Sequence, residues 1–129
     1  MFTSEAVTRR VRIAVVAEYA PQRSRPAQNQ WFFLYTITIT NEGEDVVQLL
    51  SRHWVITDGA GHIEEVRGPG VVGEEPVLTP GESFEYTSWT RLATAHGTMR
   101  GSFFCMTDDA QPFDAPIGEF GLTLVSALH

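Results

Sequence analysis

Glu64 to Trp89 is the stretch that decides the fold, because it holds Gly68-Pro-Gly-Val-Val-Gly73 and the Pro80-Gly81 turn between two candidate strands. Two sets of side chains alternate along the second strand: Phe84, Tyr86 and Ser88 against Glu85, Thr87 and Trp89. A period of two is that of a half-buried β-strand. The stretch therefore predicts a strand, a glycine-rich loop, a turn and a second strand, in that order.

The same alternation extends outward along the chain. Further strands are predicted at Val7–Tyr19, Trp31–Asn41, Val46–Asp58, His62–Arg67, Thr98–Met106 and Ile117–Ala127. Val46–Asp58 carries apolar side chains on both faces, which is typical of a central strand that is covered on both sides. Pro21 and Pro26 exclude a regular helix from residues 20–30, which we expect to form a loop.

These strands predict an all-β fold. Short strands separated by turn signals are typical of a β-sandwich of immunoglobulin or fibronectin type III kind, here with about seven to eight strands. We expect a single domain that spans residues 1–129. The side chains expected in its core are Trp31, Phe33, Ile37, Trp54, Phe84, Phe103 and Leu122, together with Ile117, Phe120 and Leu124 of the last strand.

Composition bounds the class of protein. The chain has 129 residues, a net charge of −7 and one cysteine, Cys105. Nucleic acid is not expected as a partner, because binding phosphates needs a basic face. A lone cysteine cannot form an internal disulfide, and we find neither a signal peptide nor a run of about 20 apolar residues that could cross a membrane. A cytoplasmic protein without a membrane partner is the expectation.

All nine positive charges are arginines, and three of them, Arg9, Arg10 and Arg12, cluster near the start of the chain. Arginines at alternating positions of a strand usually face solvent, and this is the interpretation that we favour. The alternative is an edge that binds phosphate.

Three segments of the sequence resemble the ApaG family. They are Val47-Gln-Leu-Leu50, Arg52-His-Trp54 and Gly68-Pro-Gly-Val-Val-Gly73, and further matches follow in order over about 110 residues, among them Pro80-Gly81, Tyr86-Thr-Ser88, Gly97-Thr-Met99 and Pro112-Phe113. Two departures stand out: Leu34 occupies a position where the family usually has alanine, and Trp89 replaces a common glycine.

The resemblance implies a fibronectin type III-like sandwich and a bacterial, cytoplasmic protein. It also implies a link by phenotype to cobalt and magnesium tolerance. In eukaryotic relatives the domain looks like a partner-binding module. The resemblance carries no established activity onto particular residues of this chain.

The loop from Gly68 to Gly73 matches G-x-G-x-x-G, a pattern of dinucleotide-binding proteins. That pattern holds pyrophosphate only where a helix opens at its third glycine, and Val77-Leu-Thr-Pro80-Gly81 leaves no room for one. Glu74 and Glu75 would also repel a phosphate. We therefore favour a structural turn. The alternative is a nucleotide- or pyrophosphate-binding protein, or a phosphohydrolase, in which Gly68, Gly70 and Gly73 cradle phosphate.

The sequence shows no set of catalytic residues and implies no cofactor. The four histidines, His53, His62, His96 and His129, share no close ligand spacing, and His62 with Glu64 is the one pair on a common strand face. Asp108, Asp109 and Asp114 lie elsewhere. Oxygen-rich pairs can hold magnesium weakly, but paired acids in turns are usually just solvated, so no metal site is assigned. His53 is expected to be a hydrogen-bonded structural histidine, and Arg52 to pair with a nearby carboxylate.

Exposed apolar side chains are the remaining signal. Val71, Val72, Val77, Trp89, Met106 and Phe113 come from turns or outward positions, and such side chains mark a contact surface where they converge. We expect a non-enzymatic binding module with a protein partner or a second copy of itself. Gly68, Gly70, Val71, Val72 and Gly73 form the candidate partner- or anion-binding loop. The alternative is that both valines plug the open end of the sandwich.

Overall fold

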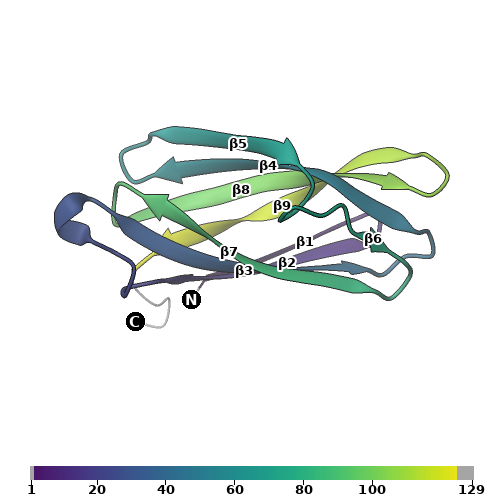
Figure 1. Ribbon diagram of the computed structural model, residues 1–129, viewed down its shortest axis with the longest axis horizontal. Helices are drawn as coiled ribbons and strands as arrows, with labels where there is room; N and C mark the ends of the chain where they lie inside the picture. Colours follow the sequence, from purple (N-terminus) through teal and green to yellow (C-terminus); the bar gives the residue numbers. More distant parts are fainter. Residues whose placement is uncertain (1, 125–129) are drawn as a thin grey trace.

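The computed structural model describes residues 2–124, and over that range nine strands form two antiparallel sheets packed face to face (Figure 1). The first sheet has the order β1 (Phe2–Thr8), β2 (Val11–Tyr19), β3 (Trp31–Asn41) and β7 (Ser83–Leu92). The second has the order β5 (Ile63–Pro69), β4 (Val47–Asp58), β8 (His96–Thr107) and β9 (Pro112–Thr123), and the short β6 (Val77–Leu78) pairs with β4. The predicted all-β sandwich is confirmed, and the only helix in residues 2–124 is a single 3-10 turn, η1 (Pro26–Gln28).

The first hairpin corrects the predicted strand at Val7–Tyr19. The chain instead turns at Arg9 and Arg10, and β1 pairs with β2 from Phe2↔Ala17 to Thr8↔Val11. Both arginines have positive φ, 48° and 64°, as the two central residues of a type I′ turn require. Because that turn normally uses asparagine or glycine, two arginines gave no signal for it.

A β-bulge in β4 explains why apolar residues occupy both of its sequence phases. Leu49 pairs with Cys105 whereas Ser51 pairs with Phe104, so Leu50 is an extra residue. A bulge moves all later side chains to the opposite face. Leu49 therefore faces the core before the bulge, and Trp54 faces it afterwards. The prediction of a strand covered on both faces is wrong for this reason, although Val55 is buried on the outer side.

An aromatic cluster forms the middle of the core. The Trp54 ring lies 5.4 Å from Tyr35, 6.3 Å from Phe103 and 6.1 Å from Phe120, measured between ring centroids. Most of the predicted core is buried, namely Phe33, Ile37, Trp54, Phe103, Ile117, Phe120 and Leu122. Trp31 and Phe84 are only partly buried and pack against this core.

The last strand begins earlier than predicted. β9 runs from Pro112 rather than from Ile117, and it lies at the end of its sheet. Prolines lack a backbone donor but are tolerated on an edge strand, so Pro112 and Pro116 do not interrupt it. Leu124, predicted in the core, is 42% exposed. The rest of the predicted strand, residues 125–127, lies outside the described residues.

The two open edges of the sandwich differ. On one side β1 and β2 both pack against β9, which closes the space between the sheets. On the other side β5 and β7 are the end strands of their sheets. The candidate site is formed by the residues that line the solvent-accessible space between β5 and β7.

Candidate functional site

The glycine loop ends in a two-residue hairpin turn. The Val71 N–H donates to the Glu74 carbonyl oxygen over 2.7 Å, and the Glu74 N–H donates to the Val71 carbonyl oxygen over 3.0 Å. The two residues between Val71 and Glu74 have positive φ, 44° for Val72 and 82° for Gly73, which makes a type I′ turn. The chain then continues into β6 and not into a helix.

The backbone N–H groups of Gly70 and Val71 in this loop already donate hydrogen bonds. The Gly70 N–H donates to the Leu50 carbonyl oxygen over 2.7 Å, Val71 and Glu74 donate to each other, and Pro69 has no N–H. A phosphate cradle needs such N–H groups to point at the ligand. The arrangement does not supply them at these positions.

Gly68 and Gly70 are each explained by close neighbours. A Cβ atom on Gly68 would lie 3.0 Å from the Arg52 guanidinium, and one on Gly70 would lie 2.6 Å from the Glu74 carbonyl oxygen. Gly70 also has a φ of 67°. Glycine at these positions therefore serves local packing and backbone geometry.

The two valines of the loop separate. Val71 is fully buried in the core, whereas Val72 is 50% exposed. The two alternatives for the loop thus apply to one valine each: Val71 plugs the space between the sheets, and Val72 faces solvent. Val72 also holds a left-handed backbone conformation, which is a strained one for a β-branched residue.

Replacement of Val72 by asparagine is expected to stabilise the protein. Asparagine tolerates the left-handed region and is the preferred residue before glycine in a type I′ turn. We expect a gain of about 1 kcal/mol in the free energy of unfolding, from relief of backbone strain. Urea denaturation measures it, with Val16→Asn, at an exposed position of β2, as the control. A loss of stability would show that the Val72 side chain supports the fold.

A cavity of about 270 Å³ opens between the sheets beside Val72. Its apolar lining comes from Trp54, Ile56, Val66 and Met99. The polar lining groups are Tyr35, Arg52, Glu64, Tyr86, Ser88 and Thr90. Val72 and Trp89, both 50% exposed, border the same cavity, so two of the predicted contact residues meet there.

Arg52 enters this cavity because of the bulge. After Leu50 the side chain of Arg52 lies on the same face as that of Trp54, and its Cα partner on β5 is Gly68, which leaves room for the guanidinium. Nη1 donates to the carbonyl oxygens of Pro69 at 3.0 Å and Gly70 at 3.3 Å. The expected ion pair is not formed: within residues 2–124 no carboxylate lies within ion-pair distance of Arg52.

Two tyrosines share the cavity with Arg52. Burial raises the pKa of the Tyr35 hydroxyl, and it raises the pKa of the Tyr86 hydroxyl further. Both groups therefore stay protonated near neutral pH and can donate a hydrogen bond. The Tyr86 hydroxyl oxygen is buried and has no hydrogen-bond partner among the described residues.

Trp89 borders the cavity from the end strand β7. Its place in β7 puts it on the outer face of the sheet, paired with Leu34, and its ring lies 5.2 Å from that of Phe32. The Arg23 guanidinium lies 5.7 Å from the ring centre. Half of the tryptophan is still exposed, so a large aromatic surface remains free on the outer face of β7, next to the cavity.

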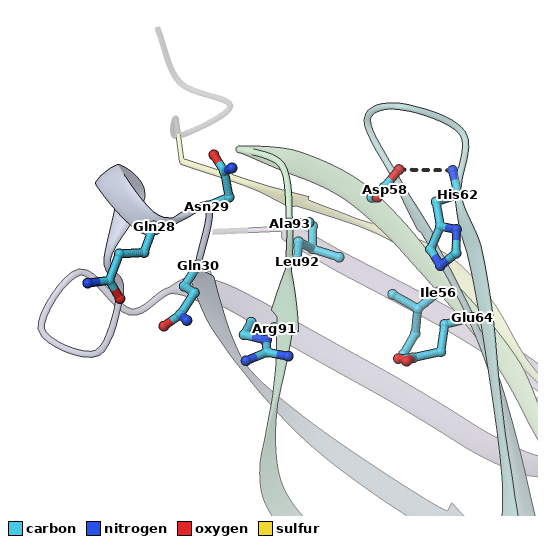
Figure 2. Close-up of a pocket in the computed structure, with 10 residues that line it drawn as sticks. All are labelled: Gln28, Asn29, Gln30, Ile56, Asp58, His62, Glu64, Arg91, Leu92 and Ala93. Carbon is cyan, nitrogen blue, oxygen red and sulfur yellow. Dashed lines mark hydrogen bonds between the residues drawn. The ribbon is translucent and has the colours of Figure 1, made fainter.

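A second cavity, of about 460 Å³, continues from the first toward the β4–β5 hairpin (Figure 2). The two cavities share Ile56 and Glu64 in their linings. Figure 2 shows His62 and Glu64 on one side and Gln28, Asn29 and Gln30 on the other. The Asp58 carboxylate accepts hydrogen bonds from the backbone N–H groups of Ala60 and His62, both 2.9 Å, and so holds the hairpin turn.

The histidine, acidic and cysteine side chains do not gather into a metal or nucleophilic site in the part of the chain that the structure describes. No group of three or more His, Cys, Asp or Glu side chains that could hold a metal occurs between Phe2 and Leu124. His129 lies outside the described residues. His53 is hydrogen bonded as predicted: its Nε2 lies 2.8 Å from Glu65 Oε1, and this bond lowers the pKa of Glu65. Cys105 is fully buried, which raises the pKa of its thiol to about 12.

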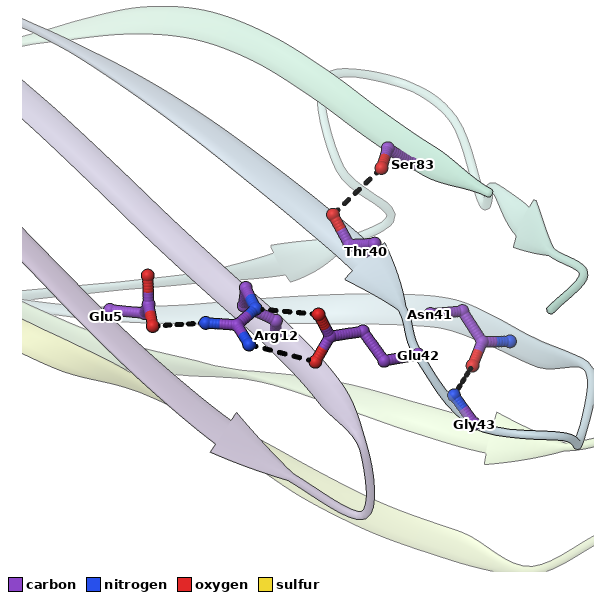
Figure 3. A network of polar contacts seen from close by, with 7 residues as sticks. All are labelled: Glu5, Arg12, Thr40, Asn41, Glu42, Gly43 and Ser83. Atoms are coloured by element: carbon purple, nitrogen blue, oxygen red, sulfur yellow. Dashed lines mark hydrogen bonds and ion pairs between the residues drawn. The ribbon is translucent and has the colours of Figure 1, made fainter. Parts of the chain in front are cut away.

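The arginine cluster near the start of the chain is partly neutralised (Figure 3). Arg12 pairs with Glu5, and its Nε lies 2.9 Å from Glu42 Oε2. The Arg9 guanidinium lies 5.0 Å from the centre of the Phe113 ring. Figure 3 also shows how Asn41 ends β3, since its Oδ1 accepts a hydrogen bond from the Gly43 N–H over 3.0 Å. These contacts favour the solvent-facing interpretation of the cluster.

The remaining apolar candidates lie elsewhere. Val77 is 54% exposed and lines a different cavity, together with Met106. Phe113 is half-buried against the core. The predicted surface is thus narrower than the sequence suggested, with Val72 and Trp89 as its shared pair.

Sequence reasoning did not find the polar groups inside the cavity. The sequence places Arg52 and Tyr86 within predicted strands, but the face of β4 to which the Arg52 side chain points depends on the bulge at Leu50. A usable signal existed, because Val47 and Leu49 are apolar in one phase while Trp54 and Ile56 are apolar in the other. Such a change of phase within one strand predicts a bulge.

Comparison with known proteins places the chain in a family. The model of the ApaG domain matches residues 21–107. Protein ApaG of Ralstonia nicotianae is 55% identical over 117 residues, covering 91% of this chain and 94% of the relative. Protein ApaG of Azoarcus sp. is 51% identical over 126 residues, covering 98% and 99%.

A solved structure agrees with these matches. The crystal structure of the putative ApaA protein from Bordetella pertussis superimposes with a TM-score of 0.87 at 49% sequence identity, covering 88% of this chain and 93% of that one. Sequence and fold lead to the same assignment, and the chain belongs to the ApaG family.

Proposed function

We propose that this protein is a non-enzymatic binding module that holds a protein partner, or a second copy of itself, at the mouth of the cavity between β5 and β7. The observation that carries the proposal is Val72. It is apolar, half exposed and held in a strained conformation that asparagine or glycine would adopt without penalty. A contact with a partner gives a reason for valine at this position.

Trp89 supports the same surface. Aromatic side chains supply much of the binding energy where a partner buries them, and Trp89 lies half exposed beside Val72 at one cavity. The flanking strands β5 and β7 end their sheets, so their outer backbone edges suit pairing with an extended segment.

The resemblance to the family implies a link to cobalt and magnesium tolerance, and we propose that the protein contributes to it as a regulator that acts through its partner. We propose the cytoplasm as its compartment, which is supported by the lone, buried Cys105. In the described part of the chain, no helix has the length and apolar character needed to span a membrane.

The alternative of a nucleotide- or pyrophosphate-binding protein is less well supported. Its phosphate would have to use the loop from Gly68 to Gly73, where the N–H groups of Gly70 and Val71 already donate to backbone carbonyls. A panel of nucleotides with magnesium or cobalt tests it. Turnover that survives purification and is lost in Gly70→Glu, while this variant keeps its melting temperature, would favour the phosphohydrolase.

Photocrosslinking tests the proposed function. A benzophenone amino acid at position 89 is expected to form a covalent adduct with a defined partner in cells, because Trp89 borders the contact surface. The control carries the same group in place of Val16, which is 39% exposed on β2. An adduct of twice the chain mass indicates a second copy. Equal yields at both positions, or no adduct at position 89, would overturn the proposal.

A further inference from the structure

Arg52 supplies an unused positive charge inside the cavity. Its Nη1 is engaged by two carbonyl oxygens, but no carboxylate pairs with the guanidinium within the described residues. An arginine that is half withdrawn from water without a counter-ion favours binding of an anion. The most direct complement to this group is therefore a carboxylate or a similar oxyanion.

Tyr86 supplies a second unused donor. Its hydroxyl is buried without a partner, and a buried donor left unsatisfied costs free energy that a ligand acceptor would recover. Arg52, Tyr35 and Tyr86 all line the same cavity. Since both tyrosines stay protonated, their hydroxyl groups and the guanidinium can all donate a hydrogen bond within this cavity.

The rest of the cavity favours a chain over a small ion. Its walls include Trp54, Ile56 and Met99, Val72 borders it, and the exposed ring of Trp89 lies next to it on the outer face of β7. The cavity runs into its neighbour past Ile56 and Glu64. A ligand can therefore extend from one cavity into the other between β5 and β7, as an extended peptide does.

We infer that this cavity binds the side-chain carboxylate of an Asp or Glu in an extended segment of the partner, with the acid against Arg52 and Tyr86 and a large apolar neighbour against Val72 and Trp89. The inference rests on the proposed function and specifies the chemistry of its partner. Glu64 disfavours negative charge where the two cavities join. A single acid at the Arg52 end fits this arrangement better than an acidic run.

A displayed library of random linear peptides provides the test. Peptides selected on the purified protein are expected to share one acidic residue beside an aromatic or large aliphatic one. The best peptide is then synthesised with its acid as Glu and as Gln. The Glu form should bind at least about tenfold more tightly, because it forms charge-assisted hydrogen bonds to Arg52 and Tyr86.

Variants of the protein separate the roles of its residues. Tyr86→Phe should lower the affinity for the Glu peptide about tenfold and leave the affinity for the Gln peptide unchanged. Its melting temperature should not fall, because the hydroxyl that is removed has no partner in the protein. Tyr19→Phe, a partly buried tyrosine elsewhere, should change neither affinity. If Tyr86→Phe is misfolded, the affinities of the unmodified protein for the Glu and Gln peptides still show whether it recognises a carboxylate.

The outcomes are distinguishable. Selected peptides that lack an acid, or that bind equally well as Glu and Gln forms, overturn the inference of a bound carboxylate. If the binding of such peptides is lost in Trp89→Ala, the proposed function still holds. Binding that is unchanged in Trp89→Ala argues against the proposed function itself. Competitive displacement by pyrophosphate, or no enrichment above empty support, overturns the inference.

Discussion

Replacing Val71 by aspartate is expected to unfold the protein. Val71 is fully buried between the sheets, and an ionised carboxylate there loses hydration without gaining a partner. The penalty for such a charge is several kcal/mol, and a domain of this size has about 5–15 kcal/mol of stability in total. Circular dichroism and a melting curve will show whether a cooperative transition remains.

Val72→Asp is the matched control for this substitution. Val72 is the next residue in the same turn, is half exposed, and has a φ of 44° that aspartate tolerates. We expect its melting temperature to stay within a few degrees of that of the unmodified protein, as for most surface substitutions. Equal destabilisation by both variants would contradict the separation of the two valines.

Trp54→Ala is expected to destabilise the protein by about 3–5 kcal/mol, because it leaves a cavity in the aromatic cluster with Tyr35, Phe103 and Phe120. Urea denaturation measures the change. Trp89→Ala is the control, since its half-exposed ring should contribute about 1 kcal/mol or less. A loss below about 1 kcal/mol for Trp54→Ala would show that the cluster does not hold the sheets together.

Alternation predicted most of the fold because side chains of a half-buried strand must alternate. It failed where local geometry changed without a residue signal. Arg9 and Arg10 form a turn that gives no such signal, and Leu50 adds a bulge that reverses the faces of β4. The last strand was predicted to begin at Ile117 and begins at Pro112, since an edge strand tolerates proline.

The site was less predictable than the fold. The sequence indicated that the glycine loop and Trp89 matter, and it correctly raised the question whether Val71 and Val72 both point inward. It could not separate them, since the direction of each depends on the type of turn. The proximity of Arg52 to Tyr86 depends on packing between two sheets, for which a single sequence carries no pattern.

The most direct test of the binding surface combines two readings on Val72→Asp: its melting temperature and the yield of the crosslink from position 89. A charge at the rim should remove an apolar contact and repel an acidic partner segment, whereas the fold should be untouched. We predict a normal melting temperature with the crosslink lost. A folded variant that still forms the adduct in full yield, or a variant that no longer folds, would contradict a partner-binding surface at Val72 and Trp89.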